Sequence, residues 1–250
     1  MLRGILVPMP EEIELIIENM EVHSVYESGR RKFYNGVLNG KKCVVALSRI
    51  GKVASSVTAA VMIERFKIDQ LIVAGVAGAV ASHLKLGDIV VATESIQHDL
   101  DARPLFPQFE APLLDKAFFS CNEILVSKAL EACKEFLKDD FKDYILAEDI
   151  QQFSLNNPSI YCGQIGCGDQ FIGSSEQLSK ISRQLPEVLC VEMEGGAVGQ
   201  ICYEYNIPYV IVRTISDSAN DRAPIDFNRY IQRVAKYYTY GITRKIINSI

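Results

Sequence analysis

Short runs of β-branched and apolar residues alternate along the chain with longer segments in which apolar residues recur every three or four positions. This alternation predicts strands interleaved with helices, which is the pattern of an α/β protein. The predicted strands are residues 4–9, 32–38, 42–48, 70–74, 86–93, a run that begins at 159, 188–191 and 211–217. The predicted helices are residues 11–20, 53–66, 122–137, 175–185, a run that begins at 195, and 227–249.

The connections between these elements carry their own signals. Asn39-Gly40 separates two strand patterns and predicts a β-hairpin. Residues 103–119 are rich in Pro and Phe and predict an apolar loop, whereas residues 138–158 are first charged and then turn-rich. We interpret the second segment as an irregular excursion and not as a linker, so the sequence predicts one domain over residues 1–250.

The strand predicted over residues 211–217 carries the first candidate for chemistry. Its apolar part ends in Ser216 and Asp217, and a polar loop follows. Ligands of open α/β sheets bind at the carboxyl ends of strands. An acid held there by a neighbouring hydroxyl is therefore a candidate proton donor. An Asp that caps a turn would give the same pattern, so the spacing alone leaves both interpretations open.

Further acids lie at two other junctions between a strand and a helix. Glu12 follows the first strand at the start of a helix, where Pro10 and acidic residues suit the helix dipole. Glu192 and Glu194 flank Met193 after the strand at 188–191. A carboxylate close to an apolar core is costly unless it is hydrogen-bonded or functional. For Glu12, the local sequence by itself favours a surface acid over a functional one.

Composition narrows the class of protein. Of the 250 residues 48% are apolar, which excludes a disordered chain, and the net charge of −5 provides no basic field for nucleic acid or anionic lipid. No apolar stretch approaches the ~20 residues of a membrane span. The seven cysteines are odd in number and lack CxxC spacing, which is typical of reduced thiols in the cytoplasm. We expect a cytoplasmic protein without nucleic-acid or membrane partners.

Several partial motifs do not support cofactor or metal sites. Gly51-Lys52 lacks the first glycine of a phosphate loop, and the small residues 75–80 do not follow the dinucleotide pattern. His98 lies beside Asp99 and Asp101, but no second group of ligands has metal-binding spacing. We therefore interpret the segment around His98 as a turn or a subunit contact.

Four segments, taken together in this order and spacing, resemble one family. They are Met9–Glu12, Ile50–Ala54, Val191–Gly195 and Arg213–Asp217, supported by residues 75–78, 87–88 and 168–172. The chain is similar over residues 2–248 to the 5′-methylthioadenosine/S-adenosylhomocysteine nucleosidases of the nucleoside phosphorylase-like superfamily, least so across residues 103–158. The resemblance implies a three-layer αβα sandwich with a central mixed β-sheet, a homodimer, and no metal or cofactor.

The resemblance also implies roles for individual residues. Asp217 matches the acid that protonates adenine N7, with Ser216 as its hydrogen-bonding helper. Glu12 matches the carboxylate that activates the attacking water, and Glu194 matches the one that holds the ribose hydroxyls. The other implied substrate contacts are Met193 on the sugar, Phe171 and Ile172 on adenine, Met9, Ile50 and Phe227 around the 5′-alkylthio group, Arg213 and Glu192 near water and ribose, and Val76, where some relatives carry Ser.

The implied reaction is hydrolysis of the N-glycosidic bond of 5′-methylthioadenosine and S-adenosylhomocysteine, which serves methionine salvage. One carboxyl group must then be protonated while another is ionised. A purine nucleoside phosphorylase or an aminofutalosine nucleosidase is the alternative on the same fold, and a non-catalytic nucleoside-binding protein is a third. The acidic loop at residues 8–12 disfavours phosphate, and the presence of all three acids disfavours a non-catalytic protein.

Overall fold

The computed structural model describes residues 1–250 and contains one ten-stranded mixed β-sheet. The strands are β1 (Arg3–Val7), β2 (Glu21–Ser28), β3 (Arg31–Leu38), β4 (Lys41–Leu47), β5 (Gln70–Ala79), β6 (Ile89–Gln97), β7 (Phe118–Ser120), β8 (Ile160–Cys167), β9 (Val188–Glu192) and β10 (Tyr209–Asp217). The α-helices are α1 (Pro10–Glu18), α2 (Lys52–Phe66), α3 (Glu123–Glu135), α4 (Phe141–Tyr144), α5 (Ala147–Gln152), α6 (Ser175–Gln184), α7 (Gly195–Tyr205), α8 (Ala223–Tyr230) and α9 (Lys236–Ser249). Two π-helical turns, Phe136–Asp140 and Ile231–Ala235, join neighbouring helices.

Strand β10 closes part of the sheet on itself. It pairs in parallel with β5 and antiparallel with β6, while the order β10-β6-β8-β9-β5 connects the same two neighbours the other way round. Strands β1, β4, β3 and β2 extend outward from β5. All nine residues of β10 are buried, because both faces of the sheet are covered at this strand.

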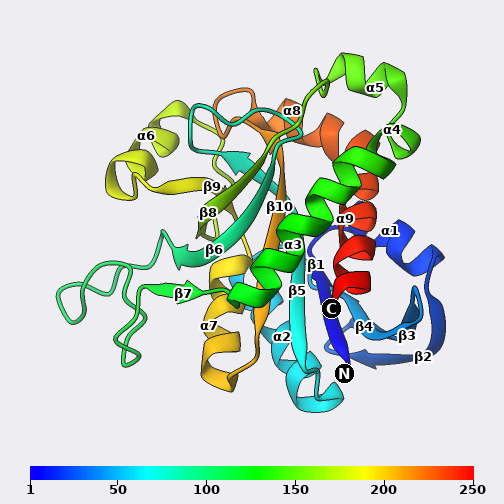
Figure 1. Ribbon diagram of the computed structural model, residues 1–250. Helices are drawn as coiled ribbons and strands as arrows, with labels where there is room; N and C mark the ends of the chain where they lie inside the picture. The colour runs from blue at the N-terminus through cyan, green and yellow to red at the C-terminus, as the bar shows by residue number, and fades with distance from the viewer.

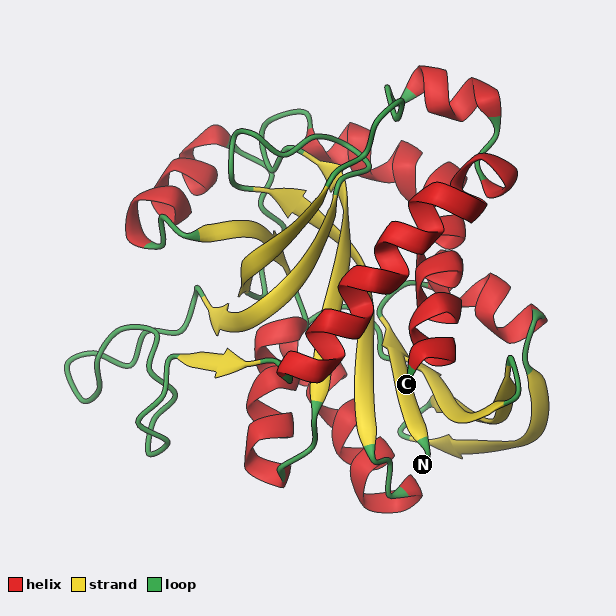
Figure 2. Ribbon diagram, viewed as in Figure 1, coloured by secondary structure: helices red, strands yellow, loops and turns green.

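Helices cover both faces of the sheet and complete three layers. Figures 1 and 2 show α1, α3 and α9 on one face, with α2 and α7 on the other. A cluster of 32 buried apolar residues fills the first interface and one of 23 fills the second. The expected αβα sandwich around a mixed sheet is confirmed.

Most predicted elements are present, with shifted ends. The hairpin at Asn39-Gly40 joins β3 to β4, and Ser174 caps α6 by accepting a hydrogen bond from the Gln177 N–H at 3.2 Å. Six of the seven free cysteines are buried, and Cys162 is exposed. No helix is both long enough and apolar enough to cross a bilayer.

Four regions differ from the prediction. Strand β5 continues through the small residues to Ala79, and the last helical region begins at Ala223 instead of residue 227. Residues 138–158 are not irregular, because they contain α4 and α5. Strand β2 gave no recognisable pattern, because all its residues but the last are exposed and buried–exposed alternation is therefore missing.

Candidate active site

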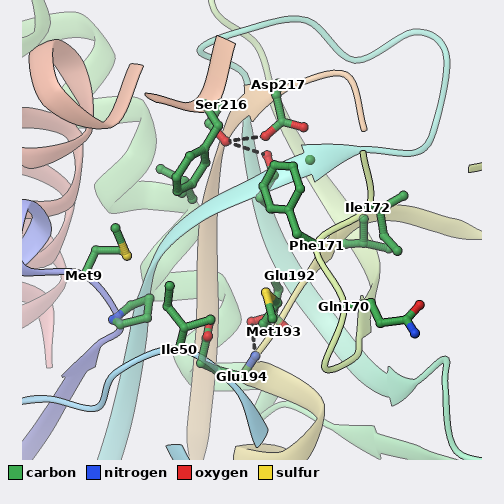
Figure 3. Close-up of a pocket in the computed structure, with 16 residues that line it drawn as sticks. Met9, Ile50, Gln170, Phe171, Ile172, Glu192, Met193, Glu194, Ser216 and Asp217 are labelled. Atoms are coloured by element: carbon green, nitrogen blue, oxygen red, sulfur yellow. Dashed lines mark hydrogen bonds between the residues drawn. The ribbon is translucent and has the colours of Figure 1, made fainter. Parts of the chain in front are cut away.

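A cavity of about 290 Å³ lies where β1, β4 and β10 end and where β8 and β9 deliver the loops that follow them. Figure 3 shows Ser216 and Asp217 at one end of this cavity, Glu192, Met193 and Glu194 at the other, and Phe171 between them. The lining residues are Pro8, Met9, Ile50, Val76, Ala77, Gly78, Gln170, Phe171, Ile172, Val191, Glu192, Met193, Glu194, Ser216, Asp217 and Phe227.

A β-bulge in β10 turns Asp217 toward the cavity. Ile215 pairs with Ala77 and Asp217 pairs with Gly78, so Ser216 is the extra residue. The Asp217 carboxylate accepts hydrogen bonds from Ser216 Oγ at 2.8 Å and from the Ala219 N–H at 2.9 Å. Burial raises the pKa of Asp217 above its ordinary value, although both hydrogen bonds oppose the rise. The residue is thereby suited to donate a proton.

Gly78 is needed at this end because of its missing side chain. A Cβ atom at Gly78 would lie 2.8 Å from Asp217 Oδ1, which is closer than van der Waals contact permits. Among the small residues 75–80, sequence analysis assigned Val76 to the site but gave Gly78 no role in it, so the close approach of Gly78 to Asp217 is seen only in the folded structure.

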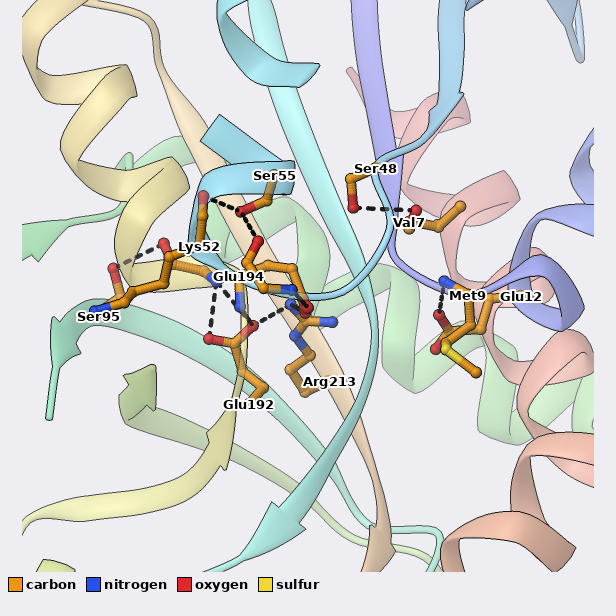
Figure 4. Close-up of polar contacts among 12 residues, drawn as sticks. Val7, Met9, Glu12, Ser48, Lys52, Ser55, Ser95, Glu192, Glu194 and Arg213 are labelled. Carbon is orange, nitrogen blue, oxygen red and sulfur yellow. Dashed lines mark hydrogen bonds and ion pairs between the residues drawn. The ribbon is translucent and has the colours of Figure 1, made fainter. Parts of the chain in front are cut away.

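The opposite end of the cavity holds charged groups around one arginine. Arg213 is fully buried on β10, and its Nη2 donates to both Glu192 and Glu194 (Figure 4). Glu192 also accepts from the Glu194 and Gly195 N–H groups at the start of α7, where the helix dipole favours an anion. Glu194 accepts from the Gly51 N–H at 3.0 Å. Burial raises the pKa of Glu194 to about 7, against the attraction of Arg213.

Glu12 is buried behind the Met9 and Val76 wall and does not itself line the cavity. One of its oxygens accepts from the Met9 N–H at 3.1 Å, and the other, Oε1, has no hydrogen-bond partner. Burial raises the pKa of Glu12 to about 8, an effect that the nearby Arg213 moderates and Glu194 reinforces. A Cβ at Gly75 would be 3.0 Å from Glu12 Oε1 and would also strike Arg213 Nη1. Glu12 and Arg213 therefore meet across a glycine.

The remaining walls are apolar. Phe171 and Phe227 pack edge to face with ring centroids 5.5 Å apart, and Phe171 keeps 41% of its surface exposed. Met9 and Ile50 lie on the other side of the cavity (Figure 3). The lining contains no lysine or arginine. The cavity thus combines an apolar body with acidic groups at both ends, a suitable environment for a flat base joined to a polyol.

The structure brings the predicted site residues together. Eleven of the thirteen line the cavity, and the other two, Glu12 and Arg213, are the buried pair behind its wall. Five further residues line the cavity and were not predicted to: Pro8, Ala77, Gly78, Gln170 and Val191. Each lies within two positions of a predicted residue in the sequence. No group of three or more His, Cys, Asp or Glu side chains is arranged to hold a metal ion.

Comparison with known proteins gives consistent matches along the whole chain. The sequence matches the phosphorylase superfamily over residues 2–247. The 5′-methylthioadenosine/S-adenosylhomocysteine nucleosidase of Staphylococcus epidermidis is 33% identical over 233 residues, which are 93% of this chain and 93% of that protein.

Solved structures of related enzymes share the fold of this chain. The 5′-methylthioadenosine/S-adenosylhomocysteine nucleosidase of Neisseria meningitidis, in complex with methylthio-immucillin-A, has a TM-score of 0.87 and 33% identity, covering 100% of this chain and 99% of that one. The futalosine hydrolase of Helicobacter pylori has a TM-score of 0.84 and 29% identity, covering 100% and 98%.

Proposed function

The chain belongs to the 5′-methylthioadenosine/S-adenosylhomocysteine nucleosidases of the phosphorylase superfamily, and we propose that it hydrolyses the N-glycosidic bond of these nucleosides with Glu12, Glu194 and Asp217. The observation that carries the proposal is the placement of three buried carboxyl groups from distant parts of the chain: Glu194 and Asp217 line one cavity, and Glu12 lies behind its wall. The products are adenine and the 5-thioribose.

Asp217 acts as the general acid. Adenine is a poor leaving group as an anion, so a proton must reach N7 while the bond from C1′ to N9 breaks. The raised pKa of Asp217 favours the protonated form that can supply this proton. Phe171 stacks on the adenine ring, and the backbone of Ile172 reads the edge of the base. Both line the cavity on the side of the loop that follows β8.

Glu12 acts as the general base. The sugar becomes oxocarbenium-like as the base departs, and the oxygen of a water molecule then bonds to C1′ while Glu12 accepts the water proton. The free oxygen Oε1 of Glu12 supports this role, because it has no protein partner to displace. Since the pKa of Glu12 is about 8, it must first lose its own proton. The positive charge of Arg213 favours that loss.

Glu194 holds the ribose. Its carboxylate is fixed by the Gly51 N–H and by Arg213, which leaves lone pairs free to accept hydrogen bonds from the ribose hydroxyls. Met193 packs on the sugar next to it. Met9, Ile50 and Phe227 provide an apolar surface for the 5′-alkylthio group, and all three line the cavity.

Water and not phosphate is the nucleophile in this proposal. Phosphate requires cationic partners, but the lining has no lysine or arginine, and the charge of Arg213, which lies behind the wall, is balanced by its ion pairs with Glu192 and Glu194. Adenine release from 5′-methylthioadenosine should proceed at the same rate in phosphate-free buffer and in buffer with added phosphate. Strict dependence on phosphate would contradict hydrolysis.

The preferred 5′ group is tested by a steady-state comparison of four nucleosides. We expect 5′-methylthioadenosine and S-adenosylhomocysteine to be cleaved more efficiently than 5′-deoxyadenosine, which lacks the 5′-thioether, and aminofutalosine, whose bulkier 5′ group must extend past Met9 and Ile50. Higher kcat/KM for aminofutalosine would instead favour the alternative activity.

The physiological setting is also part of the proposal. We place the enzyme in methionine salvage and in the recycling of S-adenosylmethionine by-products, acting in the cytoplasm as a homodimer. Seven free cysteines support a reducing compartment. Exposed apolar side chains on one helix and its preceding loop support association with a second copy, namely Ile50, Val53 and Val57. Sedimentation analysis at micromolar concentration would test the dimer.

A further inference from the structure

Three residues near the mouth of the cavity form a closed ring of hydrogen bonds. Lys52 Nζ donates to Asp99 Oδ1 at 2.7 Å, the Asp169 N–H donates to Asp99 Oδ2 at 2.8 Å, and the Lys52 N–H donates to Asp169 Oδ1 at 2.8 Å. Each member thus contacts the other two. The residues come from the start of α2, the turn after β6 and the loop after β8.

The ring joins the two loops on which the proposed substrate contacts depend. Asp169 lies two residues before Phe171, the proposed adenine-stacking ring. Lys52 follows Gly51, whose N–H donates to Glu194, the proposed ribose-binding carboxylate. Two consecutive backbone N–H groups at the start of α2 therefore donate to opposite parts of the site: that of Gly51 to Glu194 at the ribose end, and that of Lys52 to Asp169 in the adenine loop. The ring sets the distance between the two loops.

The surroundings of the ring make it a stronger link than an ordinary surface ion pair. The side chains of Lys52 and Asp99 are only 17% and 25% exposed. Burial alone would raise the pKa of Asp99, but the hydrogen bonds from Lys52 and the Asp169 N–H outweigh it and hold the pKa below its ordinary value. Asp99 is therefore ionised, and both its oxygens are occupied by charge-assisted or backbone donors.

Glycines allow the loops to approach this closely. A Cβ at Gly51, which has φ of 100°, would lie 3.1 Å from Asp169 Oδ1. A Cβ at Gly168 would lie 2.5 Å from the His98 ring, next to Asp99. Glycine is therefore needed at positions 51 and 168, where a side chain would prevent the loops from approaching the ring.

We propose that Lys52 and Asp99 are positioning residues that hold the adenine-binding loop against the ribose-binding loop. They touch neither the cavity nor the three carboxyl groups, and they act through Asp169 and Gly51. The inference rests on the proposed function, because it assigns Phe171 and Glu194 to two parts of one nucleoside.

The test compares Lys52→Met and Asp99→Asn with Lys128→Met, a matched control in an exposed ion pair on α3. KM for 5′-methylthioadenosine and the calorimetric Kd for free adenine should each rise roughly tenfold in both ring variants. We expect kcat to fall by less than about threefold, because Glu12, Glu194 and Asp217 keep their own hydrogen bonds. The control should match the unsubstituted enzyme.

Two further measurements separate positioning from a structural role. The double variant should be no worse than the poorer single variant, because each substitution opens the same ring. Lys52→Arg, which can still donate to Asp99, should retain most of the adenine affinity. If Lys52→Met does not fold, Asp99→Asn tests the same link.

The outcomes distinguish this inference from the proposed function. If the unsubstituted enzyme neither binds adenine nor cleaves 5′-methylthioadenosine, the proposed function fails. If it does both while Lys52→Met and Asp99→Asn retain the affinity of Lys128→Met, only the positioning role is overturned. A lower melting temperature with unchanged KM would likewise overturn it, since that pattern indicates stability alone.

Discussion

The two ends of the pocket hold buried carboxyl groups in opposite electrostatic surroundings. Asp217 accepts hydrogen bonds from one hydroxyl and one backbone N–H. The charged group that influences it is the anion Asp226, which raises the pKa of Asp217 further. Glu12 and Glu194 instead share the positive charge of Arg213, which lowers the pKa of both. The buried carboxyl groups therefore have a cationic neighbour at one end of the pocket and none at the other.

This difference shows which end of the cavity offers a counter-charge to an ionised carboxylate. Burial raises the pKa at both ends. Only the end with Arg213 has a counter-charge that stabilises an ionised carboxylate once the proton has left. Arg213 lies on the same strand as Asp217, four residues earlier. Strand β10 therefore carries the cation of one end and the carboxyl group of the other.

Removal of the cation should have the largest effect. Arg213→Met leaves Glu192 and Glu194 buried without their counter-charge, so we expect a loss of about 3–5 kcal/mol in the free energy of unfolding. Urea denaturation measures this loss. Arg183→Met, at an exposed site on α6, should change it by less than about 1 kcal/mol. Equal stability of the two variants would show that Arg213 does not balance the acids.

The pH dependence of stability should sharpen the contrast. The folded-state pKa of Glu12, about 8, exceeds its ordinary value of 4.5, so the folded protein binds this proton more tightly than the unfolded chain. The resulting stability is complete below pH 4.5 and is lost as pH rises toward 8. In the unsubstituted protein this proton makes the free energy of unfolding fall by about 1.4 kcal/mol per pH unit, or roughly 3 kcal/mol between pH 5 and 7. Glu12→Gln should abolish this part of the pH dependence.

Denaturation of the unsubstituted protein and Glu12→Gln at pH 5, 6 and 7 measures this difference. Glu194, with a pKa of about 7, adds a loss of the same sign that persists in the variant. A stability gap that stays constant across this range would mean that Glu12 is already ionised in the folded state.

A smaller effect is expected at the acid end. Ser216→Ala removes the hydroxyl that holds Asp217 Oδ2, so kcat should fall roughly tenfold. Because that hydrogen bond lowers the pKa of Asp217, its loss should also move the alkaline limb of the rate profile to higher pH. Ser249→Ala, near the end of α9, is the control. An unshifted alkaline limb would remove Ser216 from its helper role.

The sequence predicted the elements whose patterns are local. Strand β10 appeared as a β-branched run, and α1 appeared through its apolar residues and the proline in its first turn. Strand β2 is exposed and lacks the alternation that a half-buried strand shows. Helices α4 and α5, with only four and six residues, are too short for a helical period to emerge from a charged segment.

The site, too, has features that the local sequence predicts and features that it does not. Its acids were identified because a carboxylate next to an apolar strand is unusual, but their shared cavity came only from the family resemblance. The ring of Lys52, Asp99 and Asp169 was missed, since its members are 47 and 70 residues apart in sequence. Sequence analysis correctly set aside Gly51-Lys52 as a phosphate loop, and only the folded structure reveals its other partners.

The division of labour between the two ends is tested most directly with two substrates. In 4-nitrophenyl 5-methylthioribofuranoside the leaving group departs as a stable anion and needs no proton. Asp217→Asn should lose about 10²–10⁴-fold in kcat/KM on 5′-methylthioadenosine but less than about tenfold on the nitrophenyl riboside, whereas Glu12→Gln should lose heavily on both. Equal losses by Asp217→Asn on the two substrates would contradict its assignment as the proton donor.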